Sequence, residues 1–146
     1  MGKIIALAMT ALLFSGCSLA QKEEPVNLIQ PSELQEKFEK DETFILVLEN
    51  QQRCEPCVRY KEGGLSKLNK KEKYKAYAVE IDTVKQQKEM DILIKTLQKD
   101  LKVDTSQMVG TPSTYFIEKG ELKSSTNGPL IYDQLKEDYD KFIKNK

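Results

Sequence analysis

The sequence lacks histidine and tryptophan altogether, and it holds only three cysteines among 146 residues. Without histidine, the chain can form neither a Ser-His-Asp nor a Cys-His nucleophile, nor a histidine-containing zinc or iron site. Lysine plus arginine equal aspartate plus glutamate at 23 each, so no strong net field attracts nucleic acid, and we expect no such partner. Sulfur chemistry remains open to this chain, which is long enough for one domain.

Two of the three cysteines stand close together, in Cys54-Glu55-Pro56-Cys57. Such a pair can be half of a metal site, a structural disulfide or a thiol pair that exchanges electrons. Two thiolates without histidine would need further metal ligands from a second chain, so we expect no metal and no cofactor. The choice between the other two uses depends on where the pair lies in the fold.

The first 16 residues are typical of an export signal. Lys3 gives a positive start, and residues 4–14 form an apolar run that is shorter than the about 20 residues of a membrane span. The stretch 14–17, with small residues directly before Cys17, resembles the lipobox of bacterial lipoproteins, in which this cysteine is acylated and becomes the new N-terminus. We therefore expect a lipid anchor at the extracytoplasmic face of the bacterial cell membrane. The alternative is an ordinary signal peptide with an incidental cysteine.

Residues 17–30 lack helical periodicity and contain a proline, so they are predicted to tether a domain at 31–146 to the lipid. The end of this segment, 26–29, has the composition of a short edge strand. If Cys17 carries lipid, the domain keeps only the closely spaced cysteine pair, which outside the cytosol can persist as a disulfide.

The first half of the domain is predicted to form helix, strand and helix. A capping box of Ser32 and Gln35 predicts the start of an amphipathic helix. The unbroken apolar run 44–48 then predicts a central strand that is covered on both faces. This strand leads to the cysteine pair, after which a second helix follows, with a kink or break expected at the two glycines 63–64.

The second half continues with a strand and a long helix. Alternation over 77–81 predicts a buried strand, and Thr83 and Gln86 form another capping box. The helix that this box opens carries an apolar stripe at helical spacing, which we expect to face the core: Met90, Leu93, Ile94, Leu97 and Leu101.

A hairpin and a helix complete the domain. Residues 114–117 and 122–126 are predicted strands, joined by a turn at 118–121. Pro129 favours the start of the last helix. The side chains expected to point inward from it are Ile131, Leu135, Tyr139 and Phe142.

This order of elements predicts an α/β fold with a mixed central sheet and helices on both faces. Cys54 follows the carboxyl end of a parallel strand, where functional groups gather in open α/β sheets. The pair also lies at the start of a helix, where backbone amides and the helix dipole stabilise an anion.

Two motifs together resemble the thioredoxin family: Cys54-Glu55-Pro56-Cys57 between a strand and a helix, and Val109-Gly110-Thr111-Pro112-Ser113 before a strand and hairpin. The resemblance covers about residues 31–144 and implies the thioredoxin fold. It also implies that Pro112 is a cis-proline that faces the cysteines, and that the backbone at Thr111 pairs with an extended substrate segment. The residues by themselves favour a trans-proline at the start of an edge strand.

The sequence departs from thioredoxins proper at two places. Arg53 stands where they carry a tryptophan. Counting back from Cys54, their buried relay aspartate corresponds to Leu48, and Glu49 is expected on the opposite face of the strand. These departures favour a specialised, membrane-tethered relative over a general reductant.

The two thiols are expected to have different roles. The helix start and Arg53 favour the thiolate of Cys54, which is the expected attacking thiol, while Glu55 opposes it. Cys57, one turn inside the helix, should be more buried and should resolve the mixed disulfide. Pro56 suits the first helical turn and fixes the backbone between the thiols. Glu55 is either a solvated carboxylate or a redox tuner.

The sequence thus predicts a thiol-disulfide oxidoreductase that reduces or isomerises protein or peptide disulfides and is fed by a membrane electron donor. The Cys-x-Pro-Cys order resembles reducing members of the family, although oxidation of substrates stays open. The alternative is a lipid-anchored thioredoxin-like accessory module, as in bacteriocin-transport accessory proteins, in which the disulfide only pins a loop.

Overall fold

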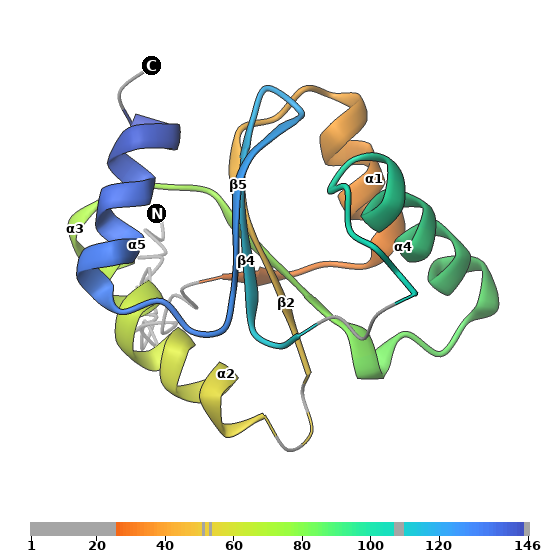
Figure 1. Ribbon diagram of the computed structural model, residues 1–146, viewed down its shortest axis with the longest axis horizontal. Helices are drawn as coiled ribbons and strands as arrows, with labels where there is room; N and C mark the ends of the chain where they lie inside the picture. Colours follow the sequence, from red (N-terminus) through yellow and green to blue (C-terminus); the bar gives the residue numbers. More distant parts are fainter. Residues whose placement is uncertain (1–25, 51, 53, 107–109, 145–146) are drawn as a thin grey trace, which may run out of the picture.

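The computed structural model describes residues 26–50, 52, 54–106 and 110–144. Its centre is a five-stranded mixed sheet in the order β1-β3-β2-β4-β5 (Figure 1). The strands are β1 (Asn27–Leu28), β2 (Phe44–Glu49), β3 (Ala76–Glu80), β4 (Ser113–Glu118) and β5 (Glu121–Asn127). The first three strands are parallel, whereas β4 runs antiparallel to β2 and β5 antiparallel to β4.

Helices cover both faces of this sheet, as the sequence predicts (Figure 1). One face carries α1 (Pro31–Glu39) and α4 (Gln87–Lys99), and the other carries α2 (Glu55–Tyr60), α3 (Ser66–Lys71) and α5 (Tyr132–Tyr139). A 3₁₀ turn, η2 (Ile81–Thr83), follows β3, and a π-helical turn, η3 (Asp140–Lys144), follows α5. No helix within the described residues is long and apolar enough to cross a membrane.

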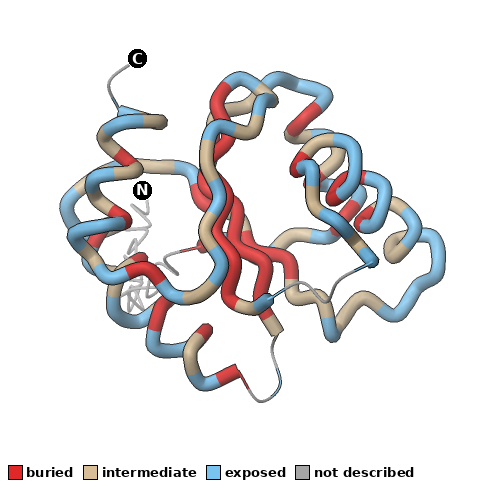
Figure 2. Tube along the Cα trace, in the orientation of Figure 1, coloured by how far each residue is buried: buried red, intermediate tan, exposed pale blue. Residues whose placement is uncertain are grey.

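Strand β2 is buried along its whole length and forms the middle of the core (Figure 2). Its side chains alternate between two apolar clusters, because successive residues of a strand point to opposite faces. Ile45 and Val47 pack in the cluster that includes residues of α3 and α5. Phe44, Leu46 and Leu48 pack in the cluster that includes residues of α1 and α4.

The predicted edge strand at 26–29 is present as β1, which pairs with β3. Val26 is buried, and the Ile29 amide donates to the Ala78 carbonyl over 2.9 Å. The expected tether, residues 17–30, is therefore joined to the sheet at its C-terminal end.

Three predicted helix starts are wrong. Helix α5 begins at Tyr132 and not at Pro129, because the residue before it, Ile131, is still in an extended conformation. The first helix begins at Pro31, with a capping box formed by Gln30 and Glu33, because proline suits the first helical position. The capping box predicted at Thr83 is absent, since the Thr83 hydroxyl donates to the Glu80 carbonyl within the 3₁₀ turn. Helix α4 therefore begins later, at Gln87.

Two apolar residues that were expected in the core lie at the surface instead. Ile94 is 39% exposed, because the buried face of α4 is centred on Leu93, Thr96 and Leu97. Ile131 is 64% exposed, since it precedes the first turn of α5 in an extended conformation. Leu130 enters the core in place of Ile131.

The two glycines at 63–64 neither break nor end the helical path. The chain passes from α2 to α3 through a single π-helical turn, η1 (Lys61–Leu65). A Cβ atom on Gly64 would lie 3.2 Å from the Leu130 carbonyl oxygen, whereas one on Gly63 would meet nothing within 4 Å. Gly64 thus allows the segment before α5 to pack closely against the helix.

The predicted hairpin turn is confirmed at Lys119 and Gly120, which both have positive φ angles, 49° and 71°. A pair of left-handed residues is the type I′ geometry that matches the twist of two antiparallel strands. A Cβ atom on Gly120 would lie 3.0 Å from both the Asp41 carboxylate and the Phe38 carbonyl. This turn therefore requires glycine both for its φ angle and for its close contact with the end of α1.

We predict that Gly120→Ala lowers the free energy of unfolding by about 1–3 kcal/mol, the usual range for a non-glycine residue held in the left-handed region. Urea denaturation measures this change. The control is Gly63→Ala, which has free space and a helical conformation and should raise the free energy of unfolding by up to about 1 kcal/mol. Equal losses in both variants would contradict the assigned turn.

Candidate thiol-disulfide site

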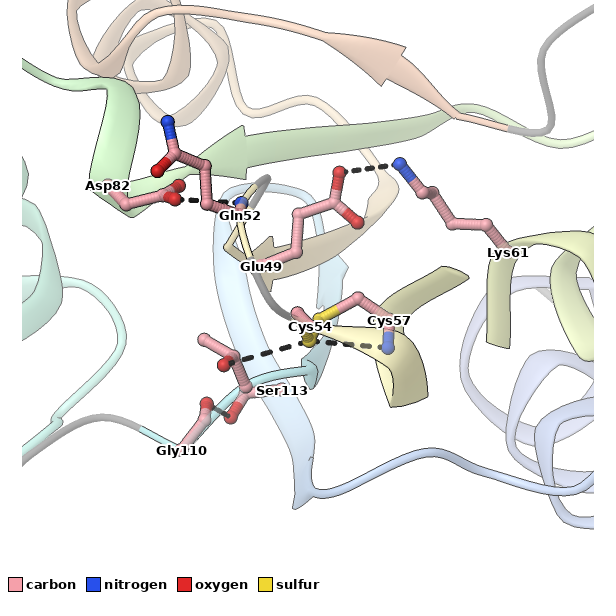
Figure 3. The surroundings of a disulfide bond; sticks show 9 residues. Glu49, Gln52, Cys54, Cys57, Lys61, Asp82, Gly110 and Ser113 are labelled. Atoms are coloured by element: carbon pink, nitrogen blue, oxygen red, sulfur yellow. Dashed lines mark hydrogen bonds and ion pairs between the residues drawn. A yellow bond between two sulfur atoms is a disulfide. The ribbon is translucent and has the colours of Figure 1, made fainter. Parts of the chain in front are cut away.

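The cysteine pair forms a disulfide at the start of α2, on the loop that follows β2 (Figure 3). The two Cα atoms are 5.2 Å apart, and the Cys57 amide donates to the Cys54 sulfur over 3.2 Å. Cys54 is the N-cap of the helix and is 7% exposed, whereas Cys57 in the first turn is 1% exposed. The sulfur of Cys54 therefore lies where helix amides stabilise a thiolate, and Cys57 is the more deeply buried of the two.

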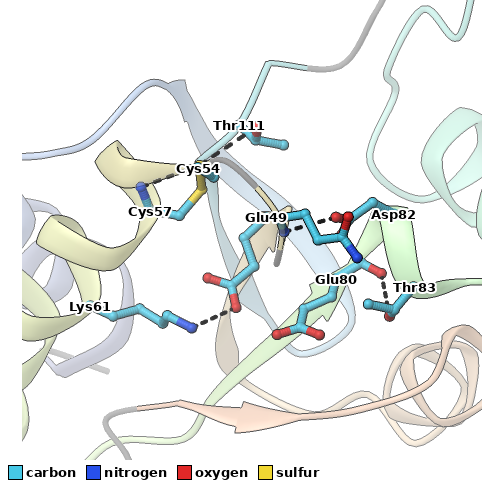
Figure 4. A network of polar contacts seen from close by, with 9 residues as sticks. Glu49, Cys54, Cys57, Lys61, Glu80, Asp82, Thr83 and Thr111 are labelled. Carbon is cyan, nitrogen blue, oxygen red and sulfur yellow. Dashed lines mark hydrogen bonds and ion pairs between the residues drawn. A yellow bond between two sulfur atoms is a disulfide. The ribbon is translucent and has the colours of Figure 1, made fainter.

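A second loop faces the disulfide from the start of β4. Its Thr111-Pro112 peptide bond is cis, as the resemblance implies, and Thr111 Oγ1 lies 4.0 Å from the Cys54 sulfur (Figure 4). The Pro112 carbonyl accepts a 2.8 Å hydrogen bond from the Gly128 amide. This bond ties the cis-proline loop to the segment that leads into α5.

The Ser113 hydroxyl fixes the other end of the same loop. It donates to the Gly110 carbonyl and lies 2.9 Å from the Asn127 side-chain oxygen at the end of β5. The loop is therefore held at both ends by hydrogen bonds, which fix the position of its backbone next to the disulfide.

The buried acid of this site is Glu49. It lies on the opposite face of β2 from Leu48, as expected, but the residue on the side of the disulfide is Glu49 and not Leu48. Glu49 shares the face of Ile45 and Val47, because it is two residues beyond Val47 in the alternating strand. Leu48 instead points to the α1 and α4 side. In both close-ups the Glu49 side chain extends from the end of β2 between the disulfide and Lys61 (Figures 3 and 4).

The Glu49 carboxylate is only partly neutralised. It is 1% exposed, and Lys61 Nζ of the π-helical turn donates to Oε1 over 2.9 Å. The other oxygen, Oε2, is buried with no hydrogen-bond partner among the described residues. Burial raises the pKa of Glu49, the Lys61 contact lowers it, and the negative charges of Glu80 and Asp82 raise it further, so that the pKa stands above the usual range.

The remaining predicted site residues lie apart from this buried acid. Glu55 is exposed and forms an ion pair with Arg59, whose Nη1 is 2.7 Å from its carboxylate. Pro56 occupies the first helical turn between the cysteines, as predicted. Arg53 and Cys17 lie outside the described residues.

Sequence reasoning missed the roles of Glu49 and Lys61 in this site. Strand alternation alone places Glu49 on the same face as Val47, so the signal for Glu49 is present in the sequence itself. The position of Lys61 depends on the π-helical turn, which has no clear pattern in the sequence. The bond between Pro112 and Gly128 is likewise set by loop geometry and not by a motif.

Comparison with known proteins gives the fold a name. No protein-family model matches the sequence, and no curated protein matches it. Among solved structures, the chain is similar to thioredoxin from Aeropyrum pernix, with a TM-score of 0.58 and 18% identity over 77% of this chain and 83% of that one. For thioredoxin O2 from Arabidopsis thaliana in the oxidised state, the TM-score is 0.57 and the identity 19%, over 81% of this chain and 94% of that one. For Fasciola hepatica thioredoxin, the TM-score is 0.58 and the identity 14%, over 80% of this chain and 99% of that one. At these identities the likeness establishes the thioredoxin fold.

We predict that the wild-type protein loses free energy of unfolding as pH rises because of Glu49, and that Glu49→Gln lacks this contribution. Because the folded state raises the pKa of Glu49 above its ordinary value of 4.5, the folded protein retains a proton that the unfolded chain has already lost. This contribution to stability is complete below the ordinary pKa and is lost as pH rises through the raised one. In urea unfolding between about pH 4 and pH 8, the free energy of unfolding should fall less steeply with rising pH in Glu49→Gln than in the wild type.

Glu42→Gln provides a control of opposite sign. Burial by itself would raise the pKa of Glu42, but the hydrogen bond and charge of Lys37, together with Lys75, outweigh it and lower the pKa. Its stabilising contribution is therefore present above the ordinary pKa and is lost as pH falls. If both variants changed the pH profile in the same direction, the account of Glu49 would be wrong.

Proposed function

We propose that this chain is a lipid-anchored, extracytoplasmic thiol-disulfide oxidoreductase that acts through Cys54 and Cys57 and reduces or isomerises protein disulfides. The observation that carries this proposal is the disulfide at the start of α2, which faces the cis Thr111-Pro112 bond within a thioredoxin fold. A disulfide that only pinned a loop would need neither the helix start nor the second loop beside it.

In the reduced protein, the Cys54 thiolate attacks one sulfur of a substrate disulfide. A mixed disulfide forms between Cys54 and the substrate, and the other substrate sulfur leaves as a thiolate. The Cys57 thiolate then attacks the Cys54 sulfur, closes the Cys54-Cys57 disulfide and releases the second substrate sulfur. Two electrons pass to the substrate, and a membrane electron donor returns two electrons to the protein.

Glu49 is suited to accept the Cys57 proton in this second step. The residue lies between the disulfide and Lys61, and its unpaired Oε2 is the atom left free to take a proton. A carboxylate with a raised pKa is a better proton acceptor near neutral pH than an ordinary one. Glu49 thus supplies the buried acid that the residue count assigned to Leu48.

The charges around the pair favour a reductant. A protein of this kind is a strong oxidant when its surroundings stabilise the thiolate of the reduced form. A nearby negative charge destabilises that thiolate and therefore makes the protein a better reductant. The buried Glu49 carboxylate supplies such a charge, which its single contact with Lys61 neutralises only in part. The charge of Glu55 is paired with Arg59 and is also exposed to water, which screens it. The disulfide form is therefore favoured over the dithiol, and the protein tends to give electrons to its substrates.

The N-terminal sequence supports the membrane location. An apolar run precedes Cys17, and the described chain begins at Val26, already packed on the sheet. The eight residues between them span at most about 29 Å when fully extended. An acylated Cys17 would therefore keep the edge strand β1 within about that distance of the bilayer surface.

The first test measures the reduction potential of the Cys54-Cys57 pair by equilibration with glutathione and dithiothreitol buffers. We expect a value near the reducing end of the family, about −270 mV, and not near the oxidising end, about −120 mV. Disulfide reduction should stop in Cys54→Ser, whereas Cys57→Ser should accumulate the mixed disulfide with its substrate. A bond that resists reduction well below about −300 mV would indicate a structural disulfide instead.

The second test concerns the anchor. We expect Cys17→Ala to move the protein from the membrane fraction to the soluble fraction, because a single cysteine at the end of the signal is the acylation site. Cys54→Ala removes another cysteine and should leave the distribution unchanged. An unaltered membrane fraction in Cys17→Ala would exclude lipid attachment at this position.

A further inference from the structure

An apolar groove runs along the helix that carries the disulfide. Its volume is about 440 Å³, and it lies between the path from α2 to α3 and the segment that leads into α5. The groove begins at Pro56, between the two cysteines, and continues past Gly63 and Gly64 to Lys67. Leu130 and the exposed side chain of Ile131 form its other wall. The groove thus starts at the redox motif and leads away from it.

Both walls of this groove are held in place. Gly64 lets the Leu130 carbonyl come so close that a Cβ atom would lie 3.2 Å from it. The Tyr60 hydroxyl lies 2.9 Å from Thr114 Oγ1 under the groove. The groove is therefore a preformed surface and does not need a conformational change to open.

Lys67 lines the far end of the groove, and Lys71 lies one helical turn beyond it, beside the same tyrosine ring as Lys67. Lys67 Nζ lies 4.1 Å from the centre of the Tyr132 ring, and Lys71 Nζ lies 5.3 Å from the same centre. Among the described residues, no carboxylate approaches either ammonium group within the 4.0 Å of an ion pair. The other cation along the groove, Arg59, is already paired with Glu55. Two unpaired like charges beside one ring favour the approach of an anion.

We propose that this groove binds an extended segment of the substrate protein that carries an apolar side chain next to its reactive cysteine and a carboxylate farther along the chain. The apolar side chain contacts Pro56, the segment then passes along Leu130 and Ile131, and the carboxylate lies at Lys67 and Lys71. This inference rests on the proposed function, since it describes the substrate of the same disulfide.

The geometry fixes the spacing between the two recognised groups. Pro56 and Lys67 are eleven residues apart on a continuous helical path, which corresponds to about 16 Å at 1.5 Å per residue. An extended peptide advances about 3.3 Å per residue, so that about five residues separate the apolar residue on Pro56 from the carboxylate.

The test uses synthetic peptides with a leucine beside a single cysteine. A glutamate stands five positions from the leucine, N-terminal to it in one peptide and C-terminal to it in the other, and matched peptides carry glutamine in its place. Serine analogues are titrated against the oxidised full-length protein in mild detergent. The cysteine peptides, as mixed disulfides with glutathione, are reduced by the dithiol form. On one side, we expect the glutamate peptide to bind and react roughly two- to fivefold better, the size of exposed charge contacts.

Matched variants isolate the groove. The preference for glutamate should disappear in Lys67→Gln/Lys71→Gln and persist in Lys88→Gln/Lys95→Gln, which removes the same charge from α4 on the other face of the sheet. Ile131→Gln should weaken binding of all the peptides, whereas Ile94→Gln, an equally polar change on α4, should not. Equal effects of the groove and α4 variants, or no preference for glutamate on either side, would overturn the proposal.

Two further measurements separate this inference from its alternatives. Reduction of the small molecule bis(2-hydroxyethyl) disulfide reports the thiol chemistry alone and should be unchanged in all four variants. If the wild-type protein does not reduce this small disulfide but still binds the glutamate peptides better, the proposed function fails and the docking site stands. If Lys67→Gln/Lys71→Gln instead loses only its binding to phosphatidylglycerol vesicles, the lysines contact the membrane and the docking site is wrong.

Discussion

The burial of β2 on both faces is the constraint on which the rest of the structure depends. A strand that is covered on both sides has no solvent face, so every side chain, including Glu49, must enter one of the two cores. Because β2 pairs with β3 on one side and with β4 on the other, its end brings together the disulfide of α2 and the cis-proline loop of β4. The position of the reactive groups therefore follows from the packing of one strand.

The same constraint explains why the buried acid needs Lys61. A carboxylate that is removed from water is unfavourable unless a cation or hydrogen-bond donors compensate it. Lys61 follows Cys57 by four residues, so that it lies on the same side of the helical path and reaches the end of β2. The compensation stops at one oxygen. The site thus keeps one buried oxygen without a hydrogen bond among the described residues, which costs stability, and such local exceptions are typical of functional positions.

The sequence was sufficient for most of the fold and for half of the site. Apolar runs and turn residues placed β2, β3 and the hairpin, because each of these signals is local. Helices α1 and α4 begin at Pro31 and Gln87, and the sequence placed both starts at other residues. Several nearby polar residues compete to cap a helix, so the pattern does not single out one of them. The cysteine pair and Pro112 were found through motifs. Glu49 was missed because the count from Cys54 assumed a loop length, although the alternation of β2 assigned its face correctly.

The segment that leads into α5 contacts both the cis-proline loop beside the disulfide and the helix that lines the groove. It donates from Gly128 to the Pro112 carbonyl, and two residues later its Leu130 carbonyl packs on Gly64. One short stretch of backbone therefore fixes the cis-proline loop and the groove in a single frame. A substrate that rests on both surfaces has its cysteine positioned from two sides, so orientation comes from the frame and not from motion of either loop. In the proposed reaction, recognition at Lys67 and attack by Cys54 would then be coupled by geometry alone.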